Sequence, residues 1–232
     1  MPMTPIVLVP GLCATPRFFA AQATELWKHG PVQVANHTRD ETMFGIAARI
    51  LDEAPPRFAL VGHSMGGYIT FEILRQASSR VTRVAFLDTS ARPDTSEQTQ
   101  RRREVIAVAL QGRLRQVADL QFPLLVHPAA RDDARLRDAV RAMMDDTGID
   151  AFIRQEQAII HRADSRPTLA KIRCPALVLV GEQDAITPPD VAEEIAAGIR
   201  GARLAKIPEC GHMSAMEQPA AVNAALAAWL DG

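Results

Sequence analysis

Short apolar segments alternate with longer segments of helical pattern along most of this 232-residue chain. The apolar segments are rich in β-branched residues and are bounded by turn-forming residues, which is typical of strands buried on both faces. Strands that alternate with helices form a parallel sheet, because each crossover helix returns the chain to the same edge. We therefore predict an α/β fold with a mostly parallel sheet of about six strands flanked by helices. The expected strands are residues 6–9, 32–35, 58–62, 81–87, 176–180 and 203–207.

The connections between these strands carry helical patterns, except in one long region. The expected helices of the sheet region are residues 18–29, 43–53, 66–76, 191–199 and 219–230. Between residues 91 and 169 no segment has a convincing strand pattern, and three segments of mixed charge there predict helices, at 98–114, 132–148 and 150–164. We therefore expect residues 1–90 and 170–232 to form the core, and residues 91–169 to form a helical cap insertion.

The composition excludes several classes of function. Lys and Arg number 26 and Asp and Glu number 27, so the net charge of −1 argues against a protein that binds nucleic acid by charge. Three cysteines without a Cys-x-x-Cys pair argue against a disulfide framework or a zinc site. The chain lacks an apolar run of the ~18 residues that a membrane span needs, and its first apolar run is too short for a secretion signal. We expect a cytoplasmic protein, and the oligomeric state stays open.

The segment Gly-His-Ser-Met-Gly at residues 62–66 lies between an expected strand and an expected helix. This context predicts a nucleophile elbow, a sharp turn that exposes a serine at the carboxyl edge of the sheet. The flanking glycines avoid clashes between Cβ atoms and the neighbouring backbone. The sequence therefore predicts Ser64 as the nucleophile.

A serine at its ordinary pKa is a poor nucleophile and needs a base that an acid orients. Asp184 and His212 each follow an expected strand, so both should reach the sheet edge where Ser64 lies. Asp88 also ends a strand and is the alternative acid. We favour Asp184, because Asp88 leads into the insertion, where a carboxylate can simply cap a turn.

Backbone amides are the expected stabilisers of negative charge at this site. The turn after the first strand, Pro10-Gly11-Leu12-Cys13, should supply the amide of Leu12, and the elbow should supply that of Met65. Cys13 has no neighbouring base in the sequence, so we interpret it as part of a pocket wall.

These motifs resemble the α/β-hydrolase superfamily along nearly the whole chain. The landmarks are Val-Pro-Gly-Leu at 9–12, Gly-His-Ser-Met-Gly-Gly at 62–67, Gly-Glu-Gln-Asp-Ala-Ile-Thr-Pro-Pro at 181–189 and Glu-Cys-Gly-His-Met-Ser-Ala-Met-Glu-Gln-Pro at 209–219. Pro10 is a departure, since many members carry histidine there, and the first strands of larger members are absent. The insertion resembles the cap of small bacterial carboxylesterases, enol-lactone hydrolases and cofactor-free haloperoxidase-like enzymes.

The resemblance implies a serine hydrolase that needs neither a metal nor an organic cofactor. It would cleave a carboxylic ester, or a related acyl bond, of a small and largely apolar substrate through an acyl-enzyme. Alternatives are a lactone, carbon–carbon bond or perhydrolase activity on the same triad, or a ligand receptor without catalysis. The candidate pocket residues are Phe122, Leu124, Leu125, Met143, Met144, Phe152, Ile153 and Met213.

Overall fold

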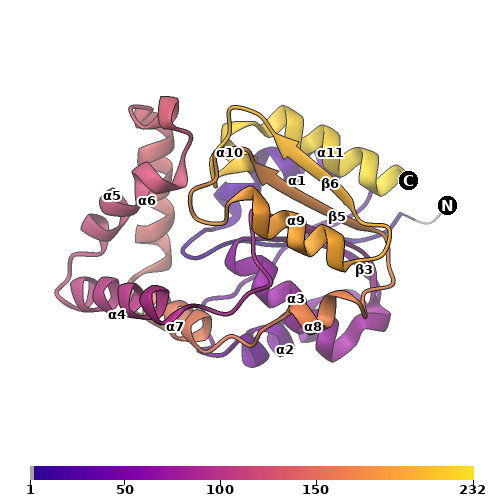
Figure 1. Ribbon diagram of the computed structural model, residues 1–232, viewed down its shortest axis with the longest axis horizontal. Helices are drawn as coiled ribbons and strands as arrows, with labels where there is room; N and C mark the ends of the chain where they lie inside the picture. The colour runs from indigo at the N-terminus through magenta and orange to yellow at the C-terminus, as the bar shows by residue number, and fades with distance from the viewer. Residues whose placement is uncertain (1–2) are drawn as a thin grey trace.

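A computed structural model describes residues 3–232, and its centre is one six-stranded sheet in which all neighbouring strands are parallel (Figure 1). The spatial order is β2-β1-β3-β4-β5-β6. The strands are β1 (Ile6–Val9), β2 (Val32–Val34), β3 (Phe58–His63), β4 (Val81–Leu87), β5 (Ala176–Gly181) and β6 (Arg203–Ile207). The predicted parallel α/β fold is therefore confirmed, and all carboxyl ends of the strands meet at one edge.

Helices cover both faces of the sheet (Figure 1). On one face α1 (Ala20–Leu26) packs against α11 (Pro219–Asp231), and on the other α2 (Met43–Glu53) packs against α3 (Met65–Ala77), with α9 (Pro189–Gly198) beside β5. Short helical turns complete this part of the chain: η1 (Pro16–Phe19), η2 (Ser78–Arg80) and α10 (Ser214–Glu217). The segment 18–29, predicted as one helix, is divided between η1 and α1.

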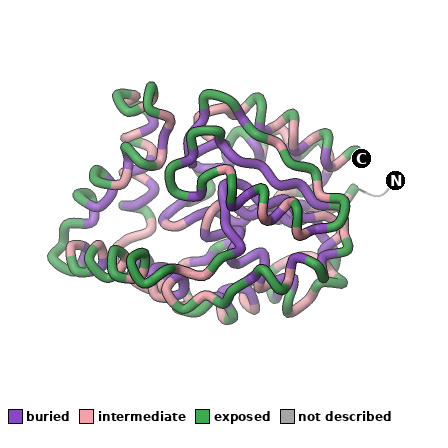
Figure 2. Tube along the Cα trace, in the orientation of Figure 1, coloured by how far each residue is buried: buried purple, intermediate pink, exposed green. Residues whose placement is uncertain are grey.

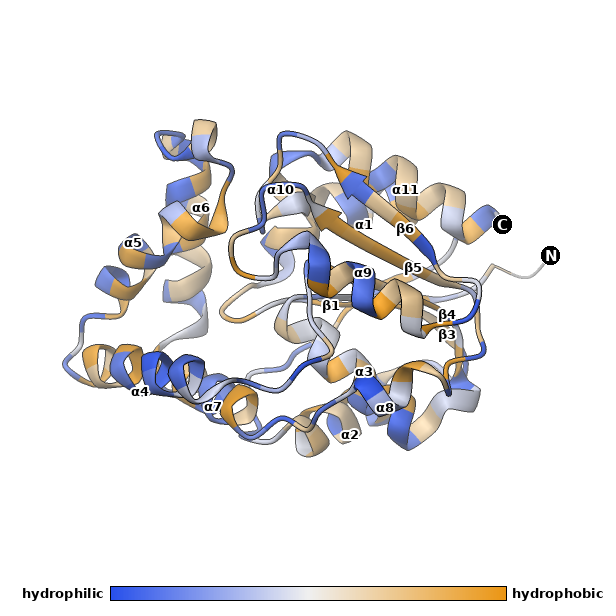
Figure 3. Cartoon of the chain, viewed as in Figure 1, coloured by the Kyte–Doolittle hydropathy of each residue, from blue (hydrophilic) through white to orange (hydrophobic). Residues whose placement is uncertain are grey.

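Two hydrophobic cores result, because successive side chains of a strand point to opposite faces. In β1, Ile6 and Leu8 belong to the core under α1 and α11, whereas Val7 and Val9 belong to the core under α2 and α3. The central strands are buried along their length, as the purple tube in Figure 2 shows, and they are apolar in Figure 3. Burial on both faces explains why these strands have continuous apolar sequences.

The chain between β4 and β5 is helical, and we call residues 91–169 the helical insertion. Its helices are α4 (Ser96–Leu110), α5 (Leu114–Leu125), α6 (Ala134–Thr147), α7 (Ile149–Ile160) and α8 (Arg166–Leu169), with the turn η3 (Pro128–Ala130). Helix α5 was not predicted, because Pro123 lies inside it and prolines usually end helices. Figure 1 shows α4–α7 beyond the strand ends at which the arrowheads point. Among residues 3–232, the structure has no helix with the length and apolarity of a membrane span.

Candidate active site

The turn between β3 and α3 holds Ser64 in a backbone conformation that side chains rarely adopt, with φ 51° and ψ −117°. Two glycines make this turn possible. A Cβ atom on Gly62 would lie 2.4 Å from the Gly66 carbonyl oxygen, and one on Gly66 would lie 2.0 Å from the Val9 carbonyl oxygen. The Ser64 amide donates to the Leu87 carbonyl at 2.9 Å, which fixes the turn to β4.

Three side chains from three loops form a chain of close contacts at the carboxyl edge of the sheet. Ser64 Oγ lies 2.9 Å from His212 Nε2, and His212 Nδ1 lies 2.8 Å from Asp184 Oδ2. Ser64 follows β3, Asp184 follows β5 and His212 follows β6. The sheet thus brings together residues that are 148 and 28 positions apart in sequence.

The electrostatics of these three residues favour a protonated, positively charged His212 and an ionised, negatively charged Asp184. Burial alone would lower the pKa of His212, but the charge and hydrogen bond of Asp184 outweigh burial and raise it. Burial would likewise raise the pKa of Asp184. The charge and hydrogen bond of His212, together with hydrogen bonds from Thr187, outweigh burial and lower that pKa. Asp184 is therefore suited to stabilise an imidazolium.

Asp88, the alternative acid, lies elsewhere at the same edge. Its Oδ1 accepts the Gly181 amide at 3.0 Å and its Oδ2 pairs with the Ser214 hydroxyl. Burial and the neighbouring Asp184 raise the pKa of Asp88 well above its usual range, which favours the neutral acid. In the structure the carboxylate in contact with His212 is that of Asp184.

A cavity of about 590 Å³ opens onto Ser64 and His212, and its lining differs from side to side. Helices α5 and α6 contribute a mostly apolar wall: Leu120, Leu124, Leu125, Val140, Met143 and Met144. Helices α4 and α7 contribute mostly polar residues: Gln98, Arg101, Arg102, Glu104 and Glu156. The cavity therefore lies between the sheet edge and the helical insertion.

Residues 48–219 match the alpha/beta hydrolase fold family, and this range covers more than half of the chain. The chain belongs to the alpha/beta hydrolase family. A curated relative, "Putative non-heme bromoperoxidase BpoC" of Mycobacterium tuberculosis, is 28% identical over 205 residues, which are 85% of this chain and 77% of the relative. These likenesses support the assignment of the chain as a hydrolase.

Solved structures of other alpha/beta hydrolases resemble this one closely. A thermophilic esterase from Thermogutta terrifontis has a TM-score of 0.88 and 29% identity, over 98% of this chain and 89% of that one. The enol-lactonase from Burkholderia xenovorans LB400 has a TM-score of 0.90 over 100% of this chain and 93% of that one. Its identity is 24%, so that likeness concerns the fold.

The predicted pocket residues of this hydrolase divide into two groups. Met143, Met144 and Met213 line the cavity, and so do Leu124 and Leu125. Phe122 and Phe152 were expected there, but both are buried in the hydrophobic core that also contains Ile6 and Leu8 of β1, and they do not line the cavity. Ile153 is half-buried against the same core. Large aromatic rings bury more apolar area in a closed core than on a cavity wall, and sequence alone does not distinguish the two positions.

The two residues predicted to donate backbone amides, Leu12 and Met65, lie close to Ser64 in the folded protein. Leu12 lines the cavity together with Ser64, and Met65 begins α3 directly after the elbow. His37 Nε2–H donates to the Gly11 carbonyl at 2.8 Å and so supports the Leu12 turn. Cys13 also lines the cavity, but burial raises the pKa of its thiol, so it is poorly suited to act as a nucleophile.

Sequence reasoning missed several residues that hold the site in place. The Thr187 hydroxyl donates to Asp184 Oδ2 at 2.8 Å, and the Ile186 and Thr187 amides donate to Asp184 Oδ1. Glu217 Oε1 accepts the amides on both sides of His212 at 3.1 Å each. The Asp-x-x-Thr spacing at 184–187 is a signal for the first arrangement, because such turns commonly bond side chain to backbone. Glu217 lies within the landmark segment 209–219, but no local spacing there predicts its hydrogen bonds.

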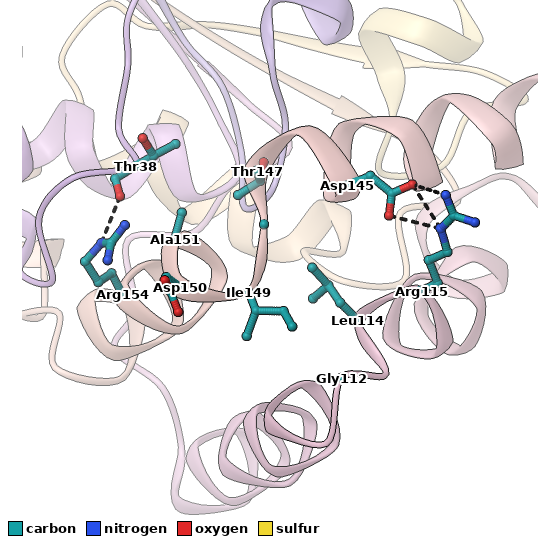
Figure 4. Close-up of a pocket in the computed structure, with 11 residues that line it drawn as sticks. Thr38, Gly112, Leu114, Arg115, Asp145, Thr147, Ile149, Asp150, Ala151 and Arg154 are labelled. Atoms are coloured by element: carbon teal, nitrogen blue, oxygen red, sulfur yellow. Dashed lines mark hydrogen bonds and ion pairs between the residues drawn. The ribbon is translucent and has the colours of Figure 1, made fainter.

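A second hollow, of about 850 Å³, lies between the insertion and the loop around Thr38 (Figure 4). Both of its arginines are already engaged: Arg115 contacts the Asp145 carboxylate at 2.6 Å, and Arg154 donates to the Thr38 carbonyl at 3.0 Å. It contains none of Ser64, Asp184 and His212. Among residues 3–232, no group of three or more His, Cys, Asp or Glu side chains is placed to hold a metal ion.

Proposed function

We propose that this protein is a serine hydrolase that cleaves a carboxylic ester of a small, largely apolar substrate through an acyl-enzyme. One observation carries the proposal: the contacts of 2.9 Å and 2.8 Å that link Ser64 through His212 to Asp184. This is the arrangement in which a serine hydroxyl can lose its proton while it attacks a carbonyl. The likeness to the Thermogutta terrifontis esterase supports the same conclusion.

In the proposed reaction, Ser64 Oγ attacks the ester carbonyl while His212 Nε2 accepts its proton. The Asp184 carboxylate accepts the hydrogen bond of Nδ1–H, so the free lone pair of the imidazole stays on Nε2. The backbone amides of Leu12 and Met65 donate to the oxyanion of the tetrahedral intermediate. His212 then returns its proton to the departing alcohol, which leaves Ser64 acylated.

Water completes the proposed cycle. His212 Nε2 takes a proton from the water molecule, the resulting hydroxide attacks the acyl carbonyl, and the proton passes to Ser64 Oγ as the acid departs. These steps use only protein groups and water. The apolar wall formed by α5 and α6 suits the hydrocarbon part of an ester, because its burial removes apolar surface from water.

The test combines a substrate panel with a label for the nucleophile. p-Nitrophenyl esters of graded chain length and a set of lactones are assayed with the wild type, Ser64→Ala and the exposed control Ser79→Ala. We expect Ser64→Ala to lower kcat by several orders of magnitude and to abolish labelling by a fluorophosphonate, with its circular dichroism unchanged. Ser79→Ala should match the wild type.

Two results would overturn this function. Labelling that persists on another residue in Ser64→Ala would remove Ser64 as the nucleophile. Thermal stabilisation by ligands without turnover of any ester or lactone would instead indicate a binding protein.

A further inference from the structure

Two residues of the polar wall of the cavity belong to a cluster of four charged side chains that the proposed chemistry does not use. Arg102 lies 2.7 Å from Asp94 and 2.8 Å from Glu156, and Arg162 lies 2.5 Å from Asp94. Arg102 and Glu156 reach the cavity from α4 and α7. Asp94 and Glu156 are almost completely buried, so this is an internal cluster rather than a set of surface ion pairs.

One oxygen of this cluster has no hydrogen-bond partner. Glu156 Oε2 is paired with Arg102, but Oε1 is buried and has no partner among the described residues. A buried carboxylate oxygen that lacks a donor costs free energy, since it has lost water and gained nothing in return. Glu156 is one of the residues that line the cavity, so the unpaired oxygen belongs to a side chain beside which a bound molecule would lie.

The charges of the cluster indicate which kind of donor fits. Asp94 and Glu156 balance Arg102 and Arg162, so an ammonium group would add an uncompensated positive charge beside two guanidinium groups. A neutral hydroxyl adds no charge. A hydroxyl also both donates and accepts, so it suits a carboxylate and equally the neutral acid that burial of Glu156 favours.

We infer that the natural substrate carries a hydroxyl group, apart from the bond that is cleaved, which donates a hydrogen bond to Glu156 Oε1. The inference rests on the proposed function, because it adds a recognition element to the same cavity. The substrate would then be a hydroxylated ester or lactone whose hydrocarbon part meets α5 and α6 and whose hydroxyl meets Glu156. Glu156 would act in specificity and take no part in bond cleavage.

Matched pairs of esters test this inference. Ethyl hexanoate is compared with ethyl 3-hydroxyhexanoate and ethyl 6-hydroxyhexanoate, and hexyl acetate with 6-hydroxyhexyl acetate, by acid release at constant pH. We expect wild-type kcat/KM to favour the hydroxylated member of at least one pair by about tenfold, as a hydrogen bond to a buried charged group can provide. Glu156→Leu should remove that preference, and Glu156→Gln, which keeps a polar side chain beside Arg102, should reduce it less. The control Glu53→Gln, on exposed α2 surface, should keep it.

The possible failures can be told apart. If the wild type prefers the plain ester in every pair, the inference is wrong while ester hydrolysis stands. If it cleaves no ester at all, the proposed function fails, and the N-ethyl amides of the same acids are used as ligands in calorimetry. Binding of a hydroxylated amide about tenfold tighter than its plain partner would still support the Glu156 site, and equal binding would refute it. The wild-type comparison also decides the matter if both Glu156 variants fail to fold.

Discussion

Two buried carboxylates, that of Asp184 at the carboxyl edge of the sheet and that of Glu156 in the helical insertion, differ in how their oxygens are paired. At the edge, both oxygens of Asp184 are occupied: Oδ1 accepts two amides, and Oδ2 contacts Thr187 and His212. In the insertion, Glu156 has one paired and one unpaired oxygen. Asp184 is thus held in place before substrate arrives, as the proposed reaction requires, whereas in our proposal Glu156 keeps one oxygen for the ligand.

The sheet edge and the helical insertion are nevertheless joined at the loop that carries His212. The Leu125 carbonyl, at the end of α5, accepts the His212 amide at 2.9 Å and the Met213 amide at 3.1 Å. His63 Nε2–H donates to the His212 carbonyl at 2.9 Å from the other side. The loop of His212 is therefore held by the sheet and by the insertion together. A change in the insertion that moves this loop should therefore also move His212.

The sharpest test of the edge concerns its two buried aspartates. We expect Asp184→Asn to lower kcat by about 10⁴, because the amide supports the wrong tautomer of His212. Asp88→Asn is the matched control and should cost far less. Asparagine resembles the neutral Asp88 acid in shape and tolerates its positive φ of 45°. Steady-state rates on p-nitrophenyl acetate, with circular dichroism for folding, measure both, and a larger loss in Asp88→Asn would reverse the assignment of the acid.

The pH profile of kcat/KM tests the His212–Asp184 pair by a second measurement. The base acts as neutral imidazole, and Asp184 raises the pKa of His212, so kcat/KM should rise with pH and reach half-maximum above the ordinary histidine value of about 6.5. Removal of the carboxylate leaves burial as the main influence, and burial lowers the pKa. In Asp184→Asn the residual activity should therefore reach half-maximum at a lower pH. A midpoint that stays fixed or moves upward would show that Asp184 does not set this pKa.

A substitution at Thr187 tests whether the hydrogen bonds to both oxygens of Asp184 contribute to kcat. Thr187→Val removes the hydroxyl that donates at 2.8 Å and keeps both the side-chain shape and the backbone amide. We expect kcat to fall about tenfold with little change in KM, because one hydrogen bond to a charged group is lost and Asp184 becomes freer to turn. Thr187→Ser should restore most of the rate. A loss shared by kcat and KM, or no rescue by serine, would indicate a merely structural role.

The sequence predicted the edge far better than the insertion, and the reason is physical. The strands, the elbow around Ser64 and the loops of Asp184 and His212 each carry a local signal, and parallel pairing then determines where they meet. Phe122 and Met143 carry no such signal. Both are apolar residues on amphipathic helices, and only the packing of α5 against α6 determines which one reaches the cavity. Hydrogen bonds to backbone, such as those of Glu217, likewise depend on tertiary structure.

The smallest expected effect comes from a comparison of two substitutions in the insertion, one on the cavity wall and one in the core. Met143 lines the cavity, so Met143→Ala should enlarge it and raise kcat/KM for longer acyl chains relative to acetate by about fourfold for each additional buried methylene. Phe152 is buried outside the cavity, so Phe152→Leu should lower the free energy of unfolding by about 1 kcal/mol and leave chain-length preference unchanged. p-Nitrophenyl esters of graded length and thermal unfolding measure both variants. If Phe152→Leu shifts the preference as strongly as Met143→Ala, the boundary between cavity wall and core is drawn wrongly, and the insertion responds to substrate as one packed unit.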